Sequence, residues 1–394
     1  MKPDQLNRRF YALDALRAIM MLLGLVIHTG VTYMPHASPV RTVMAKETWI
    51  GFFPVINLIH SFRMPVFFIV AGYFGALLFF RKGPLEMLQN RVLKILLPLI
   101  AGVLILYPII YFSFIFSSAR IAGDPSALDK AWQSIQSGSF LPYRLSHLWF
   151  LYDLMLFSIA SSAIAWLFHK ATSVQSIVNR IARYILVRPF LRIVLVAILF
   201  YIGLLINKEY TLHTNVSFWI DRNLLYCYFL FYLIGWLVYR TDLLDALQWK
   251  PLWQLAIALV LFCISMYIEL GVKASWTFQV LQIINAMVTS LMTFGVIAWF
   301  LTYCNAYSKA MAYIMDAAYF VYLIHVPISV FIPGLLANSG LHPILQFFIT
   351  ISCTITICFG IYHLMVRKSF VGKFLNGKLF SFPVTGSEKI KAIP

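Results

Sequence analysis

Four side chains suited to acid–base or charge chemistry lie within long apolar stretches of this sequence: His28, Arg63, His147 and His325. An imidazole titrates near neutral pH and serves as a general base or a nucleophile, and a guanidinium stabilises a developing oxyanion. Such groups are costly in hydrocarbon unless they face a partner or a polar cavity. Their positions on four different apolar stretches predict one polar cavity inside a bundle of helices.

The first apolar stretch also carries Arg17, eleven positions before His28. At about 100° and about 1.5 Å per residue, this spacing is close to three helical turns, so both side chains share one face about 16 Å apart. Arg17 is then expected near one membrane surface, and His28 deep in the opposite half of the membrane. Asp14 lies one turn before Arg17 and is expected to pair with it.

Positive charge is concentrated at the predicted cytoplasmic ends of the first three apolar stretches. The members of this basic group are Arg17, Arg81, Arg91 and Lys94. Several cationic side chains close together are typical of a site for an anionic cofactor.

The composition of the chain shows what positions these groups. Hydrophobic residues make up 61% of the 394 positions and charged residues 11%, and the mean hydropathy is +0.82. A soluble domain could not bury so much apolar surface in one core, so we predict an all-α, polytopic integral membrane protein. Its ten predicted transmembrane helices are 15–34, 63–80, 92–116, 147–168, 190–206, 223–239, 252–270, 278–303, 317–336 and 343–366.

The distribution of Lys and Arg predicts the orientation of this bundle. With ten spans and both the N and C termini in the cytoplasm, most of the 31 Lys and Arg residues lie on the cytoplasmic side. The net charge of +17 is therefore a signal of topology, and no nucleic-acid partner is expected. We predict a single domain over 1–394 that ends in a basic cytoplasmic tail at 367–394, and a basic amphipathic helix at 169–189 that lies on anionic lipid.

The five cysteines add no site to this prediction. They lie in or beside apolar spans, and no two of them form a CxxC pair. We therefore expect neither a disulfide nor a metal site.

Four motifs, taken in their order along the chain, resemble those of the membrane acyltransferase-3 family. They are the Arg17 to His28 spacing, the segment 63–74 that ends Ala-Gly-Tyr-Phe, the pair Arg91-x-x-Lys94, and Tyr322-Leu323-Ile324-His325. Segments 60–63 and 146–151 look most like a branch of that family associated with succinyl modification of osmoregulated periplasmic glucans. The resemblance covers nearly the whole chain, with the same order of motifs and the same number of spans.

The resemblance implies an enzyme of the bacterial cytoplasmic (inner) membrane. Proteins of this family take an acyl group from cytoplasmic acyl-CoA and deliver it to a hydroxyl of an envelope carbohydrate, such as periplasmic glucan or surface polysaccharide. The implied reaction is O-acylation with an acetyl or succinyl group, and no cofactor is bound permanently. The implied partners are acyl-CoA, the carbohydrate acceptor and the membrane lipids.

The resemblance gives the central role to His28, which matches the position of the family's catalytic histidine. This imidazole serves either as the base that activates the acceptor hydroxyl or as a nucleophile that first takes the acyl group. Arg63, His147 and His325 are expected to share in catalysis. The oxyanion that develops on the thioester carbonyl would be stabilised by Arg63, His60 or His147. If the donor is succinyl-CoA, the same residues would instead hold the free carboxylate of the succinyl group.

The basic group is, by the same resemblance, the site for the donor, because CoA carries phosphates. Arg17, Arg81, Arg91 and Lys94 are expected to hold these phosphates. Lys94 stands where the family usually has the second arginine of a pair, so one bidentate donor is lost.

Four further side chains are expected to contact the acceptor: His60, Trp149, Tyr152 and Asp153. The rings of Trp149 and Tyr152 offer stacking surfaces for sugars. Asp153 has an alternative role as an ion-pair partner of His147. The loop 117–146 is the largest predicted outer segment and is our first candidate for acceptor contact.

Two other classes of function remain open from the sequence. A transporter of a lipid-linked sugar or an anionic metabolite would use the same polar cavity, although the internal repeats typical of transporters are not visible. A non-catalytic assembly factor would have the same fold but no catalytic activity. Acylation that depends on acyl-CoA and on His28 would separate an acyltransferase from both.

Overall fold

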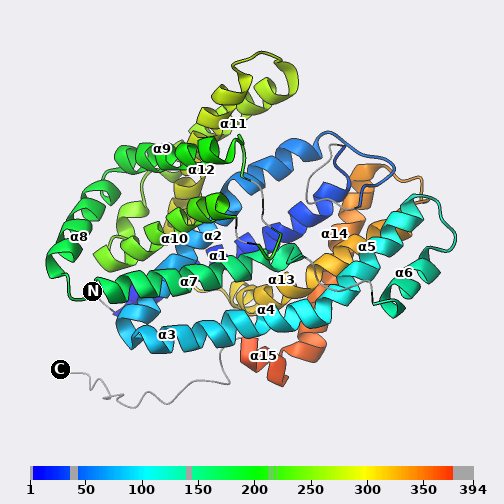
Figure 1. The fold of residues 1–394 in the computed structure, drawn as a ribbon, viewed down its shortest axis with the longest axis horizontal. Helices are drawn as coiled ribbons and strands as arrows, with labels where there is room; N and C mark the ends of the chain where they lie inside the picture. The colour runs from blue at the N-terminus through cyan, green and yellow to red at the C-terminus, as the bar shows by residue number, and fades with distance from the viewer. Residues whose placement is uncertain are drawn as a thin grey trace.

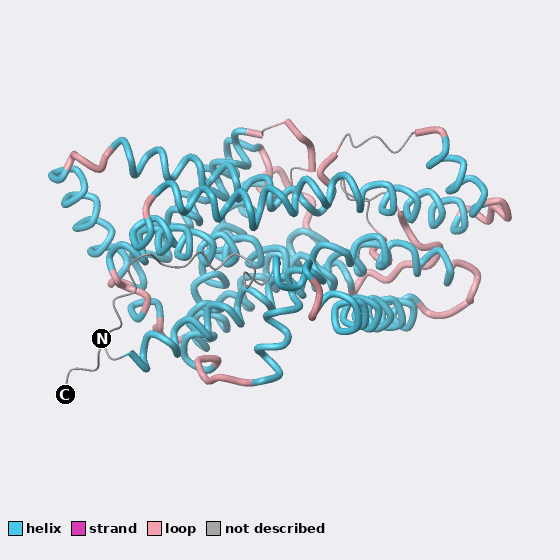
Figure 2. The backbone as a smooth tube through the Cα atoms, turned by 90° about the horizontal axis from the view of Figure 1, so that it is seen from below, coloured by secondary structure: helices cyan, strands magenta, loops and turns pink. Residues whose placement is uncertain are grey.

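The computed structural model describes residues 3–35, 43–138, 144–212, 214, 216–219 and 221–375, with side chains from residue 11 onward. Over these ranges the chain is helical and forms no β-strand, and one isolated β-bridge joins Arg144 to Ser217. The helices pack side by side into a bundle (Figure 1), and the view turned by 90° shows the same bundle (Figure 2).

Ten helices in the described residues are long and apolar enough to cross a membrane. They are α1 (Pro3–Thr32), α2 (Phe52–Lys82), the composite helix Pro84–Ile121, α7 (Trp149–Leu167), α9 (Pro189–Asn207), α10 (Arg222–Thr241), α11 (Pro251–Gly271), α12 (Thr277–Tyr303), α13 (Lys309–Leu336) and α14 (Pro343–Ile361). Each predicted span coincides with one of these helices. The prediction of an all-α, multi-pass membrane protein is therefore confirmed, and the cytoplasmic location of the termini stays a prediction.

Helix α2 begins earlier than predicted. It starts at Phe52, about three turns before the expected start at residue 63. Asn57 and His60 lower the hydropathy of these turns, but both line interior cavities. The predicted start of this helix was wrong because polar residues that face an interior cavity lower the hydropathy as much as polar residues at the membrane surface do. Hydropathy alone therefore starts the span too late.

The third span is longer than predicted and is not one regular helix. Two π-helical segments, η1 (Val92–Leu96) and η2 (Gly102–Leu106), interrupt it. The α-helical parts are α3 (Pro84–Arg91), α4 (Leu97–Ala101) and α5 (Tyr107–Ile121). Prolines at the start of α4 and α5 lack the N–H that would continue the preceding ladder, which favours an irregular turn there.

Helices α2 and α10 cross with their backbones in contact. A Cβ at Gly72 would overlap the carbonyl oxygen of Tyr232, and a Cβ at Gly235 would overlap that of Ile69. Small residues let helices approach closely enough for dispersion contacts in a membrane. This crossing fixes α2, and with it His60 and Arg63, against the rest of the bundle.

Shorter helices surround the spans. Helix α6 (Ala127–Gln136) packs on α5, and α8 (Thr172–Leu186) connects α7 to α9 at the left edge of Figure 1. The amphipathic segment predicted at 169–189 is therefore a helix. Of the predicted tail at 367–394, α15 (Phe370–Leu375) is helical, and residues 376–394 lie outside the described part.

Candidate active site

Three histidines from distant parts of the chain form one cluster. His28 comes from α1, His147 from the 3-10 turn η3 (Ser146–Leu148) that precedes α7, and His325 from α13. The ring centroids of His28 and His325 are 5.2 Å apart, those of His147 and His325 5.2 Å, and those of His28 and His147 6.4 Å. The predicted gathering of histidines is confirmed for these three.

Two of the three imidazoles have their tautomers fixed by backbone carbonyls of α13. His147 donates from Nε2 to the Leu323 carbonyl at 3.0 Å, and His325 donates from Nδ1 to the Tyr322 carbonyl at 2.7 Å. A carbonyl can only accept, so each donating nitrogen carries the proton. His147 Nδ1 and His325 Nε2 therefore keep their lone pairs, and neither has a hydrogen-bond partner among the described residues.

The sequence of α13 makes the first of these bonds available. In a regular helix the Leu323 carbonyl would accept from the N–H four residues later, but that residue is Pro327, which has none. His147 supplies the missing donor. The Tyr322 hydroxyl also donates to the backbone carbonyl of His147 at 2.7 Å. Both the side chain and the backbone of His147 are therefore hydrogen bonded to α13.

Arg63 lies beside the histidine cluster, packed against α1. It donates from Nε to the Met20 carbonyl at 3.0 Å. Its Nη2 lies 3.0 Å from the position that a Cβ on Gly24 would occupy, one helical turn before His28. The absence of a side chain at Gly24 therefore makes room for the guanidinium next to His28.

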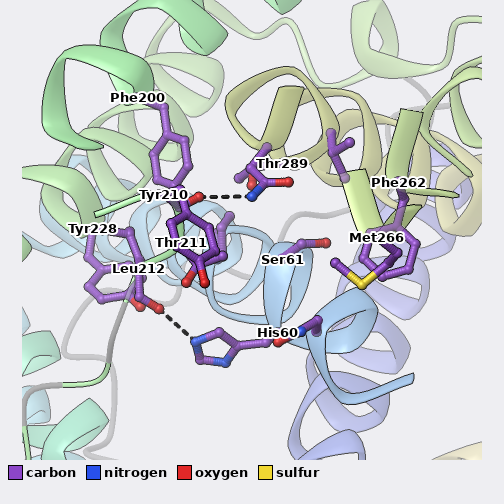
Figure 3. Close-up of a pocket in the computed structure, with 14 residues that line it drawn as sticks. His60, Ser61, Phe200, Tyr210, Thr211, Leu212, Tyr228, Phe262, Met266 and Thr289 are labelled. Carbon is purple, nitrogen blue, oxygen red and sulfur yellow. Dashed lines mark hydrogen bonds between the residues drawn. The ribbon is translucent and has the colours of Figure 1, made fainter. Parts of the chain in front are cut away.

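These groups open onto a cavity of about 310 Å³. The predicted site residues on its wall are His28, His60, Arg63, His147 and Trp149. A smaller cavity of about 40 Å³ adjoins it and shares His60 with it. Figure 3 shows this smaller cavity, in which the His60 Nε2 lies 2.8 Å from the Leu212 carbonyl.

Other predicted residues lie off the cavity wall. His325 is fully buried behind His28 and His147. Tyr152 donates from its hydroxyl to the Phe218 carbonyl at 3.3 Å. Asp153 is buried and interacts electrostatically with Tyr228. It forms no ion pair with His147 in the described structure, so the alternative of an Asp153–His147 pair is wrong.

The connection between α9 and α10 borders the cavity more than the loop 117–146 does. In the described part of that loop, Ser146 alone lines the larger cavity. The α9–α10 connection contributes Tyr210, Thr211, Leu212, Thr214 and Val216. Little in the sequence indicated this role, because the connection has no apolar period and no charge cluster.

Tyr210 and Glu269 are cavity residues that sequence reasoning missed. The Tyr210 hydroxyl donates to Glu269 Oε1 at 3.1 Å. Burial, and then the negative charge of Glu269, raise the pKa of Tyr210 to about 12, so the phenol stays protonated near neutral pH. One signal was present, since Glu269 is the sole acidic residue in the predicted span 252–270.

About three helical turns before His28 on α1, Arg17 pairs with Asp14 at 3.2 Å, as predicted. Arg91 lies within electrostatic range of Arg17. Its Nε and Nη2 atoms are buried and have no hydrogen-bond partner among the described residues. A buried guanidinium without an acceptor is costly, so this pair of arginines is suited to an anionic group.

The other two members of the basic group lie apart from this pair. The Lys94 ammonium contacts the Phe374 carbonyl and lies 4.9 Å from the centroid of the Phe374 ring, in α15. Arg81 is exposed in the last turn of α2. In the described ranges, no group of three or more His, Cys, Asp or Glu side chains is placed to hold a metal ion.

Comparisons with known proteins agree with the motifs. A family model described as an acyltransferase domain, Acyl_transf_3, matches residues 10–363. The chain is 25% identical over 397 residues to Glucans biosynthesis protein C of Escherichia coli strain K12, covering 98% of each chain. It is 24% identical over 403 residues to the protein of that name from Escherichia coli O157:H7, again covering 98% of each. No solved structure matches the chain significantly.

Proposed function

This chain belongs to the membrane acyltransferase-3 family and is an acyltransferase, and we propose that it transfers an acyl group from cytoplasmic acyl-CoA to a hydroxyl of an envelope carbohydrate. The observation that carries the proposal is the cluster of His28, His147 and His325, with two fixed tautomers, in which His28 and His147 lie on the wall of a cavity and His325 lies behind them. The relatives are named for glucan biosynthesis, so we propose a periplasmic glucan as the acceptor and the bacterial inner membrane as the location.

The donor site in this proposal is the pair formed by Arg17 of α1 and Arg91 of α3. CoA is polyanionic, and guanidinium groups bind phosphate oxygens with paired hydrogen bonds. Arg91 offers two buried donor atoms without acceptors, and Arg17 lies close to it. Arg81 and Lys94 would join the site only after their side chains turn toward this pair. The pantetheine arm would then run along α1 toward His28.

The histidine cluster would carry out the transfer. In the direct route, the acceptor oxygen attacks the thioester carbonyl carbon while His28 takes the hydroxyl proton, and the C–S bond breaks to release the CoA thiolate, which takes up that proton. In the alternative route, a His28 nitrogen attacks first and releases CoA, and the hydroxyl then attacks the acyl-imidazole. In both routes His325, whose ring centroid lies 5.2 Å from that of His28 and whose Nε2 has no hydrogen-bond partner among the described residues, would accept a hydrogen bond from His28 and orient its other nitrogen toward the cavity.

Arg63 would stabilise the negative charge that develops on the carbonyl oxygen. It lies beside His28 on the cavity wall and is held by α1. With a succinyl donor, Arg63 and His60, which both line the cavity, would also hold the free carboxylate. We therefore propose succinyl as the acyl group, with acetyl as the alternative.

Mass spectrometry of envelope glycans tests this proposal. Cells would express the wild type, His28→Ala, the matched control His169→Ala, or no copy, at equal protein levels in the membrane. His169 is exposed and outside the cluster. We expect acyl substituents with the wild type and His169→Ala only, and the mass increment identifies the donor. Equal acylation with His28→Ala would overturn the catalytic role of His28, and no acylation above background would overturn the proposed reaction.

A further inference from the structure

Besides the histidines, the wall of the 310 Å³ cavity has a second group of polar residues. Its members are Asn57 of α2, Tyr210 of the α9–α10 connection and Glu269 in the last turn of α11. Tyr210 and Glu269 are hydrogen bonded to each other at 3.1 Å. The wall of the cavity thus carries both the cationic Arg63 and the carboxylate of Glu269.

Buried side chains of α11 and α12 build this second region. Gln282 donates to the Glu209 carbonyl at 2.9 Å, and Asn285 donates to the Tyr210 carbonyl at 2.9 Å. The Ser265 hydroxyl in turn donates to the Asn285 side-chain oxygen at 2.6 Å. Figure 3 shows the bond to Tyr210 and, on the opposite side of the segment, the contact between His60 and Leu212. The connection is therefore held from both sides in one position over the cavity.

The groups in this region recognise hydroxyls. A carboxylate accepts hydrogen bonds from two or more hydroxyls, and an amide both donates and accepts. The Asn57 amide makes no hydrogen bond to the described residues, although it lines both cavities. It lies one turn before His60 on the same face of α2. A few polar groups of this kind, placed among apolar walls, orient a ligand in a pocket.

The charge of this region selects between classes of sugar. Glu269 is the acidic residue on the described wall of the cavity. A uronic acid or a phosphorylated sugar would bring a second negative charge close to it, which costs several kcal/mol at close range when the site is desolvated. A neutral sugar brings hydroxyls that the carboxylate accepts.

We propose that Asn57, Tyr210 and Glu269 form the acceptor subsite, and that the acceptor is a neutral, polyhydroxylated sugar. This inference rests on the proposed acyl transfer to carbohydrate. The sugar hydroxyls that do not react bond to Glu269 and Asn57, and the reacting hydroxyl points toward His28. Specificity for the acceptor then resides in the α9–α10 connection and α11, and not in the loop 117–146.

Steady-state kinetics with the full-length protein in lipid vesicles test the proposal. The donor probe is succinyl-CoA or acetyl-CoA. The acceptor probes are a neutral β-linked glucose tetrasaccharide and the matched tetrasaccharide that ends in glucuronate. The variants are Glu269→Gln, which keeps an oxygen for the Tyr210 hydroxyl, Asn57→Leu, and the matched control Glu47→Gln, whose residue is exposed outside this cavity.

We expect Glu269→Gln and Asn57→Leu to raise KM for the neutral acceptor by about ten- to a hundredfold and to leave KM for acyl-CoA unchanged. Glu269→Gln should also lower the preference for the neutral over the anionic acceptor by about tenfold or more. This preference is a ratio within one preparation, so a loss of folded protein does not change it.

The Glu47→Gln control should match the wild type in every parameter. A preference unchanged in Glu269→Gln, or equal rises in both KM values, would overturn the subsite. Failure of the wild type to acylate either sugar would instead overturn the proposed function on which the subsite rests.

Discussion

His147 donates a hydrogen bond from Nε2 to the carbonyl oxygen of Leu323 at 3.0 Å, and this bond replaces the helical one that Pro327 cannot make. Pro327 thus affects a carbonyl group that lies one helical turn before it. It frees this carbonyl inside the bundle, and the carbonyl fixes the tautomer of His147. The Nδ1 of His147 then keeps its lone pair and has no hydrogen-bond partner among the described residues.

Replacing Pro327 with alanine should therefore lower the catalytic rate and at the same time stabilise helix α13. Alanine restores an N–H that competes with His147 for the Leu323 carbonyl, so the imidazole loses its fixed tautomer. We expect Pro327→Ala to lower kcat about tenfold or more and to leave the melting temperature equal to or above that of the wild type. The matched control is Pro333→Ala on the same helix, which lies beyond the cluster. An equal loss of kcat in both variants would contradict this role of Pro327.

Substitution of His147 should separate its structural role from its chemical one. The side-chain amide of His147→Gln can still donate to the Leu323 carbonyl, whereas His147→Leu cannot and leaves that carbonyl unpaired. We expect His147→Gln to keep most of the stability but lose about tenfold in kcat, and His147→Leu to lose about 1–3 kcal/mol of stability as well. Chemical unfolding and transfer rates measured on the same preparations test both effects. Wild-type kcat in His147→Gln would show that the Nδ1 lone pair has no part in the reaction.

A side chain at Gly235 should disrupt the crossing of α2 and α10. A Cβ there would overlap the Ile69 carbonyl, which is backbone and cannot move aside by rotation. We expect Gly235→Ala to lower the free energy of unfolding by about 3 kcal/mol and to reduce activity through misplacement of α2. At Gly271 nothing lies within 4 Å of the position that a Cβ would occupy, so Gly271→Ala should change stability by less than about 0.5 kcal/mol. Equal stability of the two variants, measured by thermal unfolding in detergent, would argue against a backbone contact.

The turn between α5 and α6 should be sensitive to acid. Asp124 contacts Lys130 and accepts hydrogen bonds from the Ser126 hydroxyl at 2.7 Å and the Ser126 N–H at 2.8 Å. The bond from Lys130 is the largest of the causes that lower the pKa of Asp124 to about 2. Because the folded pKa lies below the unfolded value of about 4, this carboxylate stabilises the turn above pH 4, and the stabilisation is lost as the pH falls toward 2.

Hydrogen exchange of the α6 amides measures this effect. We expect the protection factors of residues 127–136 to fall between about pH 4 and about pH 2, and Asp124→Asn to show the low values already at pH 7. A pH profile that is the same in the wild type and Asp124→Asn would assign the acid sensitivity to other groups.

The sequence predicted the parts of this structure that depend on local composition. Hydropathy found all ten spans, because each apolar stretch is long enough to be recognised without its neighbours. The shared face of Arg17 and His28 followed from helical geometry alone, and so did the pairing of Asp14 with Arg17.

The parts that the sequence did not predict depend on contacts between distant segments. The bond between His147 and Leu323 needs the fold of two helices. Glu269 and Tyr210 come together only because α12 holds the α9–α10 connection in place. Helix α2 was predicted too short for a related reason, since hydropathy cannot separate a polar side chain that faces a buried cavity from one that faces water.

Arg91 offers a prediction in which stability and binding change in opposite directions. Its buried Nε and Nη2 atoms lack acceptors among the described residues, so the ligand-free protein carries an uncompensated charge. Replacement of such a charge by an apolar side chain of similar length is neutral or stabilising by about 1 kcal/mol or more. We therefore expect Arg91→Met to raise the melting temperature of the ligand-free protein or leave it unchanged. CoA at a hundred times its Kd should stabilise the wild type by about 2.7 kcal/mol, and this gain should be lost in Arg91→Met.

The matched control is Arg192, whose side chain is fully buried. It donates from Nη1 to the Leu186 carbonyl at 2.9 Å and from Nη2 to the Leu247 carbonyl at 3.3 Å. Both of its Nη atoms therefore have acceptors within the protein, while its Nε has none among the described residues. Arg192→Met leaves these carbonyls without a donor, so it should lower stability by about 1–3 kcal/mol and keep the gain from CoA. Thermal unfolding with and without CoA measures all four quantities. If Arg91→Met lowers stability and CoA still stabilises the variant, the CoA phosphates bind elsewhere. A guanidinium that binds these phosphates destabilises the ligand-free protein and is required for stabilisation by CoA, so its replacement must change both quantities.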